Sequence, residues 1–207
     1  ITKPGYPIAS FYGYKYIGVF QSEEELAKYP HLSGDKVGDG RYEDVNKDGV
    51  LDQNDKTILG DNNPLFTAGF SNSFSYKNFT LDIQFTGSYG AEVFSFYKRM
   101  CGIDHGARNG MIEQLGRWQS KDQPGDGIHF RPTRTPSGWQ RDPSSAWVQD
   151  ASYLRLRNLT LGYNFDQKVL DKMKMKGLRL YVTGQNLFTI TNYVGYDPGS
   201  RERPARV

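Results

Sequence analysis

The stretch AGFSNSFSYKNFTLDIQFTGSYG (68–90) determines the fold class expected for this chain. In 68–76, Ala, Phe, Asn, Phe and Tyr alternate with glycine and serine. In 79–86, Phe, Leu, Ile and Phe alternate with Thr, Asp, Gln and Thr. Alternation with period two predicts strands with an apolar and a polar face, and runs of about ten residues suit a tilted strand that crosses a bilayer. The join at Lys77-Asn78 predicts an antiparallel hairpin.

Two further runs extend this pattern towards the end of the chain. In 151–165 the apolar parity changes between Leu156 and Leu159, which predicts a β-bulge near Asn158. In 178–185 leucine and valine alternate with arginine, tyrosine, threonine and glutamine. The sequence therefore predicts an all-β fold of antiparallel strands.

The connections between these runs differ greatly in length. The joins 77–78 and 166–177 are short, whereas 31–66 and 90–150 are long. Short turns on one side and long loops on the other are typical of outer-membrane β-barrels, so we expect all long segments on the outer side. From periodicity alone, a soluble β-sandwich with one buried face is the alternative, although its turns usually recur every 8–12 residues.

The rest of the chain carries weaker signals of regular structure. Residues 10–20 are aromatic and β-branched and predict a strand, and 31–63 read as loop. Ser22 and Glu25 fit a capping box for a short helix within 21–29. Two more short helices are predicted in the long loop, over 91–100 and 111–119.

Composition excludes several classes of protein. The formal net charge of +3 gives no reason to expect a nucleic-acid partner. No window approaches 18 consecutive apolar residues, which excludes a membrane-spanning helix but not spanning strands. The single cysteine, Cys101, excludes an internal disulfide framework.

Residues 44–55, DVNKDGVLDQND, match a twelve-residue calcium loop with glycine at its sixth position. The predicted ligands at positions 1, 3, 5, 7, 9 and 12 are Asp44, Asn46, Asp48, the carbonyl of Val50, Asp52 and Asp55. No amphipathic helices flank the loop, so an EF-hand sensor is not indicated. Bound Ca²⁺ would stiffen an outer loop, and the alternative is an ion-free loop held by Asx turns.

No catalytic residue is predicted. The three histidines lack zinc spacing, and Cys101 has no nearby histidine or second cysteine. A glycosidase would need two carboxylates in defined geometry, for which a sequence offers no spacing rule. The acidic residues weighed for that third hypothesis are Asp104, Glu113, Asp122 and Asp126.

Three phrases together resemble a known family. They are GDGRYEDVNKDGVLDQNDKTILGDNNPLFTAGFSNSFSYKNFTLDIQFTGSYGAEVF (38–94), DASYLRLRNLTLGYNF (150–165) and LRLYVTGQNLFTITNYVGYDP (178–198). In content and order they resemble the late region of SusC/RagA-family TonB-dependent outer-membrane transporters. The resemblance implies that 1–207 is the C-terminal part of a transmembrane β-barrel, with the plug and the N-terminal barrel absent, and that it is not an enzyme.

The resemblance also implies partners and a place in the cell. Members of this family import oligosaccharides or peptides through the outer membrane, powered through TonB, which would act on the absent N-terminal part. A SusD-like lipoprotein closes the barrel, and lipid surrounds it. The alternative function is a soluble, calcium-stiffened β-sandwich that binds glycan or protein.

Two sets of residues follow as site candidates. The polar strand residues expected to face a barrel lumen are Asp82, Gln84, Thr86, Arg179, Thr183 and Gln185. The long-loop residues that could contact a ligand or lid are Trp118, Trp139 and Arg131. Packing of the tryptophans within the loop itself is the alternative that the sequence favours.

One observation separates barrel from sandwich. A barrel wall would expose the apolar strand residues as a continuous band about 25 Å tall, whereas a sandwich would bury them against a second sheet. The residues that decide are Phe70, Phe74, Leu81, Ile83 and Phe85.

Overall fold

The computed structural model describes residues 1–102, 110–132 and 142–199. These residues form two compact units. The loop unit comprises 1–62 and 92–149, and the sheet unit comprises 63–91 and 150–199. None of the helices in the described ranges is long and apolar enough to cross a membrane.

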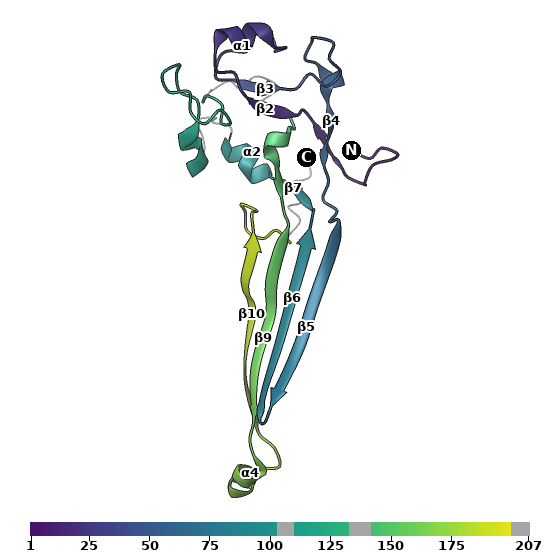
Figure 1. The fold of residues 1–207 in the computed structure, drawn as a ribbon, viewed down its shortest axis with the longest axis vertical. Coiled ribbons are helices and arrows are strands. Elements are labelled where there is room, and N and C mark those ends of the chain that lie inside the picture. The colour runs from purple at the N-terminus through teal and green to yellow at the C-terminus, as the bar shows by residue number, and fades with distance from the viewer. Residues whose placement is uncertain (103–109, 133–141, 200–207) are drawn as a thin grey trace. The chain divides into compact units, whose positions relative to one another are not determined.

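The sheet unit is one four-stranded antiparallel sheet (Figure 1). Its strands are β5 (Phe66–Tyr76), β6 (Phe79–Tyr89), β9 (Tyr153–Asn164) and β10 (Arg179–Thr191), in the order β10-β9-β6-β5. Lys77 has a positive φ of 52° in the two-residue turn between β5 and β6, so the predicted hairpin is confirmed. Helix α4 (Gln167–Met173) lies in the join between β9 and β10.

The register sorts the side chains of this sheet into two faces, because directly paired residues point to the same side. One row across the sheet is Phe74, Leu81, Leu161 and Val182. The neighbouring row is Ser73, Asp82, Thr160 and Thr183. Every strand therefore contributes to one apolar face and one polar face, as the alternation predicts.

A bulge in β9 keeps this sorting intact. Gln84 pairs with Asn158, whereas Phe85 pairs with Leu156, which leaves Arg157 as an extra residue. The change of apolar parity in the sequence coincides with this extra residue, so the leucines on both sides of it share the apolar face. The predicted bulge near Asn158 is confirmed.

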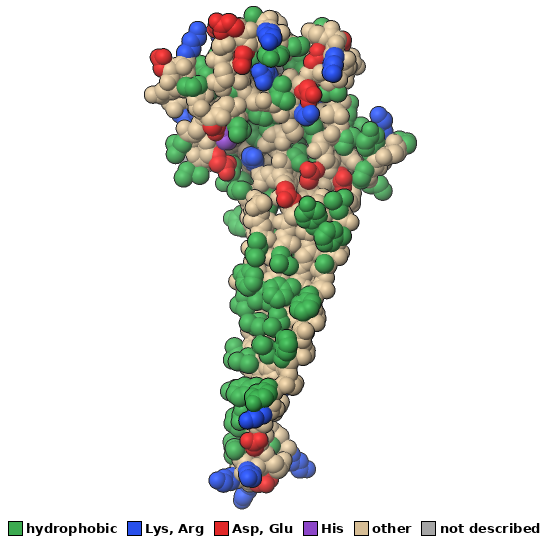
Figure 2. Space-filling view, in the orientation of Figure 1, with side chains coloured by type: hydrophobic (Ala, Val, Ile, Leu, Met, Phe, Trp, Pro, Cys, Tyr) green, Lys and Arg blue, Asp and Glu red, His purple; other side chains and the backbone are tan. Residues whose placement is uncertain are grey.

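The apolar face of the sheet is exposed within the sheet unit. Phe70, Phe74 and Val182 are 57%, 54% and 73% exposed, while Leu81, Ile83 and Phe85 are half-buried among neighbours on the same face. Figure 2 shows hydrophobic side chains following the strands. No second sheet covers this face among the described residues of the sheet unit, an arrangement that favours a barrel wall over a sandwich.

The loop unit consists of short elements. Its strands form three two-stranded sheets, which are β1–β4, β2–β3 and β7–β8. The strands are β1 (Phe11–Gly13), β2 (Tyr16–Val19), β3 (Gly40–Tyr42), β4 (Thr57–Gly60), β7 (Glu92–Phe94) and β8 (Val148–Asp150). The helices are α1 (Glu23–Lys28) and α2 (Phe96–Gly102), with 3₁₀ turns η1 (Gln53–Asp55), η2 (Ile112–Gly116) and η3 (Ser145–Trp147).

These elements confirm some expectations and correct others. The Ser22 hydroxyl accepts from the Glu25 N–H at 3.2 Å, and the Glu25 carboxylate accepts from the Gln21 N–H at 3.0 Å, so the predicted N-terminus of α1 is confirmed. The single strand expected over 10–20 is divided into β1 and β2. Residues 31–63, expected as loop, contain β3, η1 and β4. The second helix of the long loop is a 3₁₀ turn.

Two small hydrophobic clusters hold the loop unit together. Tyr14, Tyr42 and Leu51 form the first cluster. Val19, Phe130 and Trp147 form the second, and the Phe130 and Trp147 rings meet edge to face at 6.1 Å. The second cluster joins the end of β2 to Phe130 and Trp147 of the long predicted loop, so the described parts of that loop around these residues are folded against β2.

Candidate functional site

The polar face of the sheet gathers all six residues predicted to face a lumen. Asp82 lies in one row with Thr183, Gln84 in the next with Gln185, and Thr86 in the row of Arg155. Arg179 joins them through a hydrogen bond to Thr80 Oγ1, at 3.2 Å. The sequence therefore predicted which side chains share this face.

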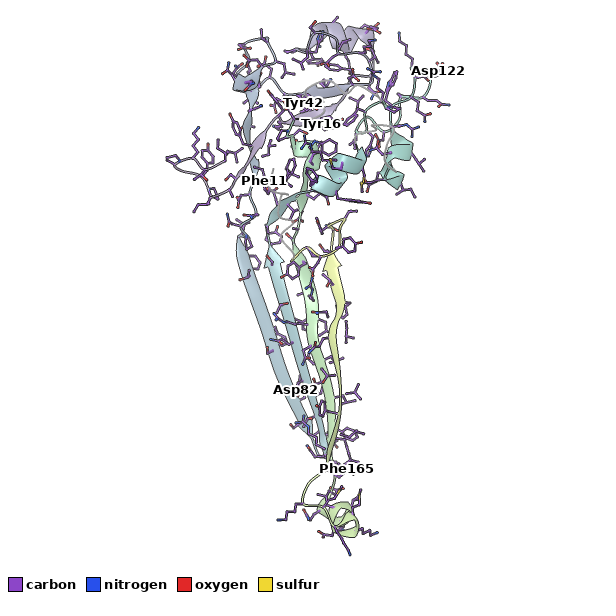
Figure 3. The ribbon with its side chains drawn as sticks, turned by 180° about the vertical axis from the view of Figure 1, so that it is seen from behind. Phe11, Tyr16, Tyr42, Asp82, Asp122 and Phe165 are labelled. Carbon is purple, nitrogen blue, oxygen red and sulfur yellow. The ribbon has the colours of Figure 1, made fainter. Side chains whose placement is uncertain are left out.

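Hydroxyl, amide and charged groups cross-link the polar face. Ser73 Oγ donates to Asp82 Oδ1 at 2.6 Å, and the Thr160 and Thr183 hydroxyls lie 2.9 Å apart. Figure 3 shows Asp82 part-way along the sheet. A surface of this composition can bind water or a polar solute through hydrogen bonds. Such bonds suit carbohydrate hydroxyls and peptide amides alike, so they do not distinguish the two.

Aromatic rings mark both ends of the apolar face. At the α4 end, the Phe79 and Tyr163 rings lie 4.9 Å apart. At the opposite end, the Phe66 and Tyr89 rings lie 5.5 Å apart. An apolar band with aromatic girdles on either side is typical of sheets that face lipid.

A polar cavity of about 320 Å³ lies where β10 ends. Arg155 donates through Nε to Thr189 Oγ1 at 2.9 Å and through Nη2 to Asp197 Oδ1 at 2.5 Å. The hydrogen bond from Arg155 holds the pKa of the Asp197 carboxyl below its ordinary value, although partial burial opposes this. Tyr196, which is fully exposed, also borders this cavity.

The long-loop candidates are engaged in the structure of the loop unit. Arg131 binds the buried Asp39 carboxylate through Nε at 2.7 Å and Nη2 at 3.1 Å, and its N–H donates to the Gly38 carbonyl. Trp118 packs on the second cluster and lies directly against Gly38. Contact of Arg131 or Trp118 with a ligand or lid stays a prediction. Trp139 lies outside the described residues.

The predicted calcium loop makes the sharp turn that its motif requires, because Gly49 has φ +84°. Asp44 accepts from the Lys47 and Gly49 N–H groups, and Asp48 from the Val50 N–H at 2.8 Å. Asp52 likewise accepts from the Asn54 backbone.

These contacts turn side-chain oxygens towards the loop's own backbone. Over the described ranges, no three Asp, Glu, His or Cys side chains converge as a metal site. In this conformation the loop carboxylates are engaged with backbone N–H groups, and calcium binding by residues 44–55 stays a prediction.

Asp55, at the last position of this loop, is fully buried. Its Oδ1 accepts from the Val45 N–H at 2.9 Å, and its Oδ2 from the Asp52 N–H at 2.8 Å. The carboxylate thus closes the loop by satisfying backbone donors at both ends. The sequence predicted Asp55 as the calcium ligand at position 12 of the loop and did not predict its contacts with the backbone.

Three of the four acidic residues weighed for a glycosidase lie in the described part of the chain. Burial raises the pKa of Asp126, but hydrogen bonds from the His129 backbone and ring and from the Ile128 N–H outweigh it, and the pKa is lowered. A lowered pKa is unsuited to a general acid. Glu113 borders a cavity of about 210 Å³ with His129, and Asp122 lies on the loop (Figure 3). Asp104 is outside the described residues.

Comparison with known proteins shows that this chain is similar to one segment of several TonB-dependent receptors. It is 35% identical to TonB-dependent receptor P3 of Formosa agariphila over 98% of its length, and 32% identical to receptor P26 of that organism over 94%. It is 26% identical to TonB-dependent receptor SusC of Bacteroides thetaiotaomicron over 95%. The chain spans about a fifth of the length of these relatives, covering 20%, 19% and 17% of them. No protein-family model matches it.

Solved structures show the same fold. A chain in the structure of the RagAB peptide transporter superposes with a TM-score of 0.71, at 22% identity, over 91% of this chain and 20% of that one. The RagAB peptide importer in its open-open state superposes with a TM-score of 0.70 over 96% of this chain and 21% of that one.

The chain is a homologue of one segment of TonB-dependent receptors. Its predicted resemblance to the SusC/RagA group is confirmed by its similarity to SusC and by the RagAB fold. Receptors and transporters of this kind are not enzymes, in agreement with the expectation that the chain performs no bond chemistry.

Proposed function

We propose that this chain forms part of the wall of a TonB-dependent transporter in the outer membrane, and that the transporter imports oligosaccharides, peptides or related nutrients. The observation that carries the proposal is the two-faced sheet. An exposed apolar face flanked by aromatic rings suits lipid, and a face of hydroxyl, amide and charged groups suits a water-filled lumen.

The open edges of the sheet support membership of a larger barrel. Within the described residues, β5 and β10 each pair on one side only. Unpaired backbone N–H and C=O groups in hydrocarbon cost several kcal/mol each, so these edges need neighbouring strands. In this arrangement the four strands of the sheet unit are neighbouring strands in the wall of a closed barrel.

The partners in the proposal follow from the relatives. TonB would supply energy, as the names of the receptors imply, and would act on a part of the protein outside this chain. A SusD-like lipoprotein would close the outer opening. The RagAB proteins are named for peptide import, whereas the polar face described above can serve either peptides or oligosaccharides.

The membrane part of the proposal is tested by two adjacent cysteines. In the full natural chain carrying Cys101→Ser, Val182→Cys places a thiol on the apolar face, and Thr183→Cys places one on the polar face. After labelling with a fluorophore in the outer membrane, brominated lipid should quench the label at 182, and aqueous iodide should quench the label at 183. Equal quenching by iodide at both positions would refute a lipid-facing wall.

The transport part is tested by deletion of the gene. The deletion strain should lose growth on either a peptide mixture or an oligosaccharide mixture as sole nutrient, while growth on the corresponding monomers is unchanged. A plasmid copy of the gene should restore growth. Unchanged growth and uptake with every polymer tested would refute nutrient import.

A further inference from the structure

One end of the four-stranded sheet carries a concentrated positive charge. The lysines at the two turns of this end are Lys77, Lys168, Lys172, Lys174 and Lys176. All five are exposed, and only two aspartates, Asp166 and Asp171, accompany them in these turns. The five lysines and two aspartates give these turns a net charge of +3, equal to the formal net charge of the whole chain. Figure 2 shows Lys and Arg side chains gathered around α4.

Hydrogen bonds hold the two turns side by side. Asn78 Nδ2 donates to Asp166 Oδ1 at 2.6 Å, and the Asn164 N–H donates to the Asn78 carbonyl at 2.8 Å. Leu170 anchors α4 because its side chain is 5% exposed and its carbonyl accepts from the Met175 N–H. The five lysines therefore belong to one ordered surface, here called the lysine tip.

The charge of the lysine tip is not neutralised by its own aspartates. Asp166 accepts from Asn78, and Asp171 accepts from Gln167 Nε2 at 2.8 Å, so neutral amides occupy both carboxylates. None of the ion pairs between described residues involves a lysine of the tip. The positive field is thus available to an anionic partner.

The surroundings of the lysine tip identify the partner. Tyr76, Phe79 and Tyr163 end the exposed apolar face on this side, and Lys77 Nζ lies 5.4 Å from the centre of the Tyr76 ring. Val169 and Met173 on α4 are 40% and 49% exposed. A partner that fits offers negative charge directly beside hydrocarbon, which is the chemistry of an anionic lipid surface.

We propose that the lysine tip binds the phosphate groups of anionic phospholipids in the membrane leaflet next to the two short turns. The inference rests on the proposed function, because it requires the apolar face to lie in a bilayer. A lysine near an anionic membrane surface strengthens attachment roughly fivefold. Several lysines on one tip therefore select anionic over zwitterionic lipid.

The test compares two charge-matched triple variants of the full natural chain purified in detergent. The tip variant carries Lys168→Gln, Lys172→Gln and Lys176→Gln; Lys174 stays unchanged because its φ is +54°. The control variant carries Lys28→Gln, Lys36→Gln and Lys121→Gln, which are exposed lysines of the loop unit. Each protein is titrated with fluorescent phosphatidylglycerol and, separately, with fluorescent phosphatidylcholine.

We expect the tip variant to bind phosphatidylglycerol at least tenfold more weakly, with phosphatidylcholine binding unchanged and the control variant like wild type. Glycerol phosphate at the same concentration should not displace the lipid, whereas displacement would identify a site for free phosphate and overturn the lipid assignment. Equal phosphatidylglycerol binding by both variants would also overturn it. If the wild-type protein embeds in membranes by the cysteine test yet does not prefer phosphatidylglycerol, this inference alone fails.

Discussion

The sheet unit and the loop unit achieve order by different means. In the sheet unit, a continuous backbone ladder carries side chains whose character alternates, so each strand meets two environments. In the loop unit, the strands have three or four residues, and two small clusters together with the buried carboxylates of Asp39 and Asp55 hold the segments. The difference teaches that a repeated local pattern suffices to order a sheet whose two faces meet different environments, whereas a compact loop depends on individual polar and apolar contacts.

The largest expected effect tests the two environments of the sheet unit. Ile83→Arg places a charge on the apolar face at mid-strand and should destabilise the assembled protein by about 2–4 kcal/mol. Gln84→Arg, one residue further, places the same charge on the polar face and should cost much less. Urea unfolding of the full natural chain from lipid vesicles measures both. Similar losses for the two variants would remove the distinction between the faces.

The next effect concerns the loop unit and its buried ion pair. Arg131→Ala leaves the carboxylate of Asp39, a residue 3% exposed, without its bidentate partner; the loop unit should be destabilised locally by about 3 kcal/mol, the low end for a buried pair because Arg131 is partly exposed. Arg131→Lys keeps the positive charge and should recover only part of this loss, because lysine cannot form the bidentate pair. Hydrogen exchange of β2 and β3 reports the change, with the exposed Lys121→Ala as control. Unchanged protection in Arg131→Ala would show that the pair is dispensable.

Calcium binding would increase the difference between the two units, because a bound ion would add one more individual polar contact to the loop unit. We expect the full natural chain to bind one Tb³⁺, displaced by Ca²⁺, in residues 44–55. Asp48→Asn keeps an acceptor for the Val50 N–H but removes a ligand charge, and should weaken binding at least tenfold. Asp122→Asn should have no effect. If wild type binds no lanthanide, the Asx turns and the buried Asp55 carboxylate hold the loop without an ion.

The smallest effect is a dependence on pH next to the last strand. The pKa of Asp197 is lowered chiefly by the hydrogen bond from Arg155, so its stabilising contribution is present above the ordinary aspartate value of 3.8. That contribution is lost as pH falls through the lowered folded-state pKa. Protection of the Gly199 N–H, which donates to Asp197 Oδ1 at 2.7 Å, should therefore decline below about pH 4.

Asp197→Asn provides the control for that measurement. Its Gly199 amide should show no such step once exchange rates are corrected for their intrinsic dependence on pH. A step of equal size in the variant would assign the pH dependence to another group.

The sequence predicted most of the sheet unit because its signals are local. Each strand shows its two faces in its own residues, and even the bulge at Arg157 is visible as a change of parity. Helix α1 was found for the same reason, since Ser22 and Glu25 are three residues apart. All six predicted lumen residues share one face because register follows from the alternation.

The loop unit was predicted poorly because its contacts join distant residues. Arg131 and Asp39 are 92 positions apart, and neither shows a pattern that points to the other. Val19, Phe130 and Trp147 form a cluster without any periodicity among them. Asp55 matched a ligand motif, yet its carboxylate accepts backbone N–H groups, which motif spacing alone cannot distinguish from metal coordination.

The pairing of β6 with β9 has a consequence for how the protein assembles. Ser88 and Tyr153 are direct neighbours in the sheet, although the whole segment from β7 to β8 separates them in the chain. Hairpin β5–β6 closes over two residues and can form early, whereas joining it to β9 requires a long chain segment to return, at an entropic cost that grows with its length. We therefore expect the pairing of β6 with β9 to form after hairpin β5–β6.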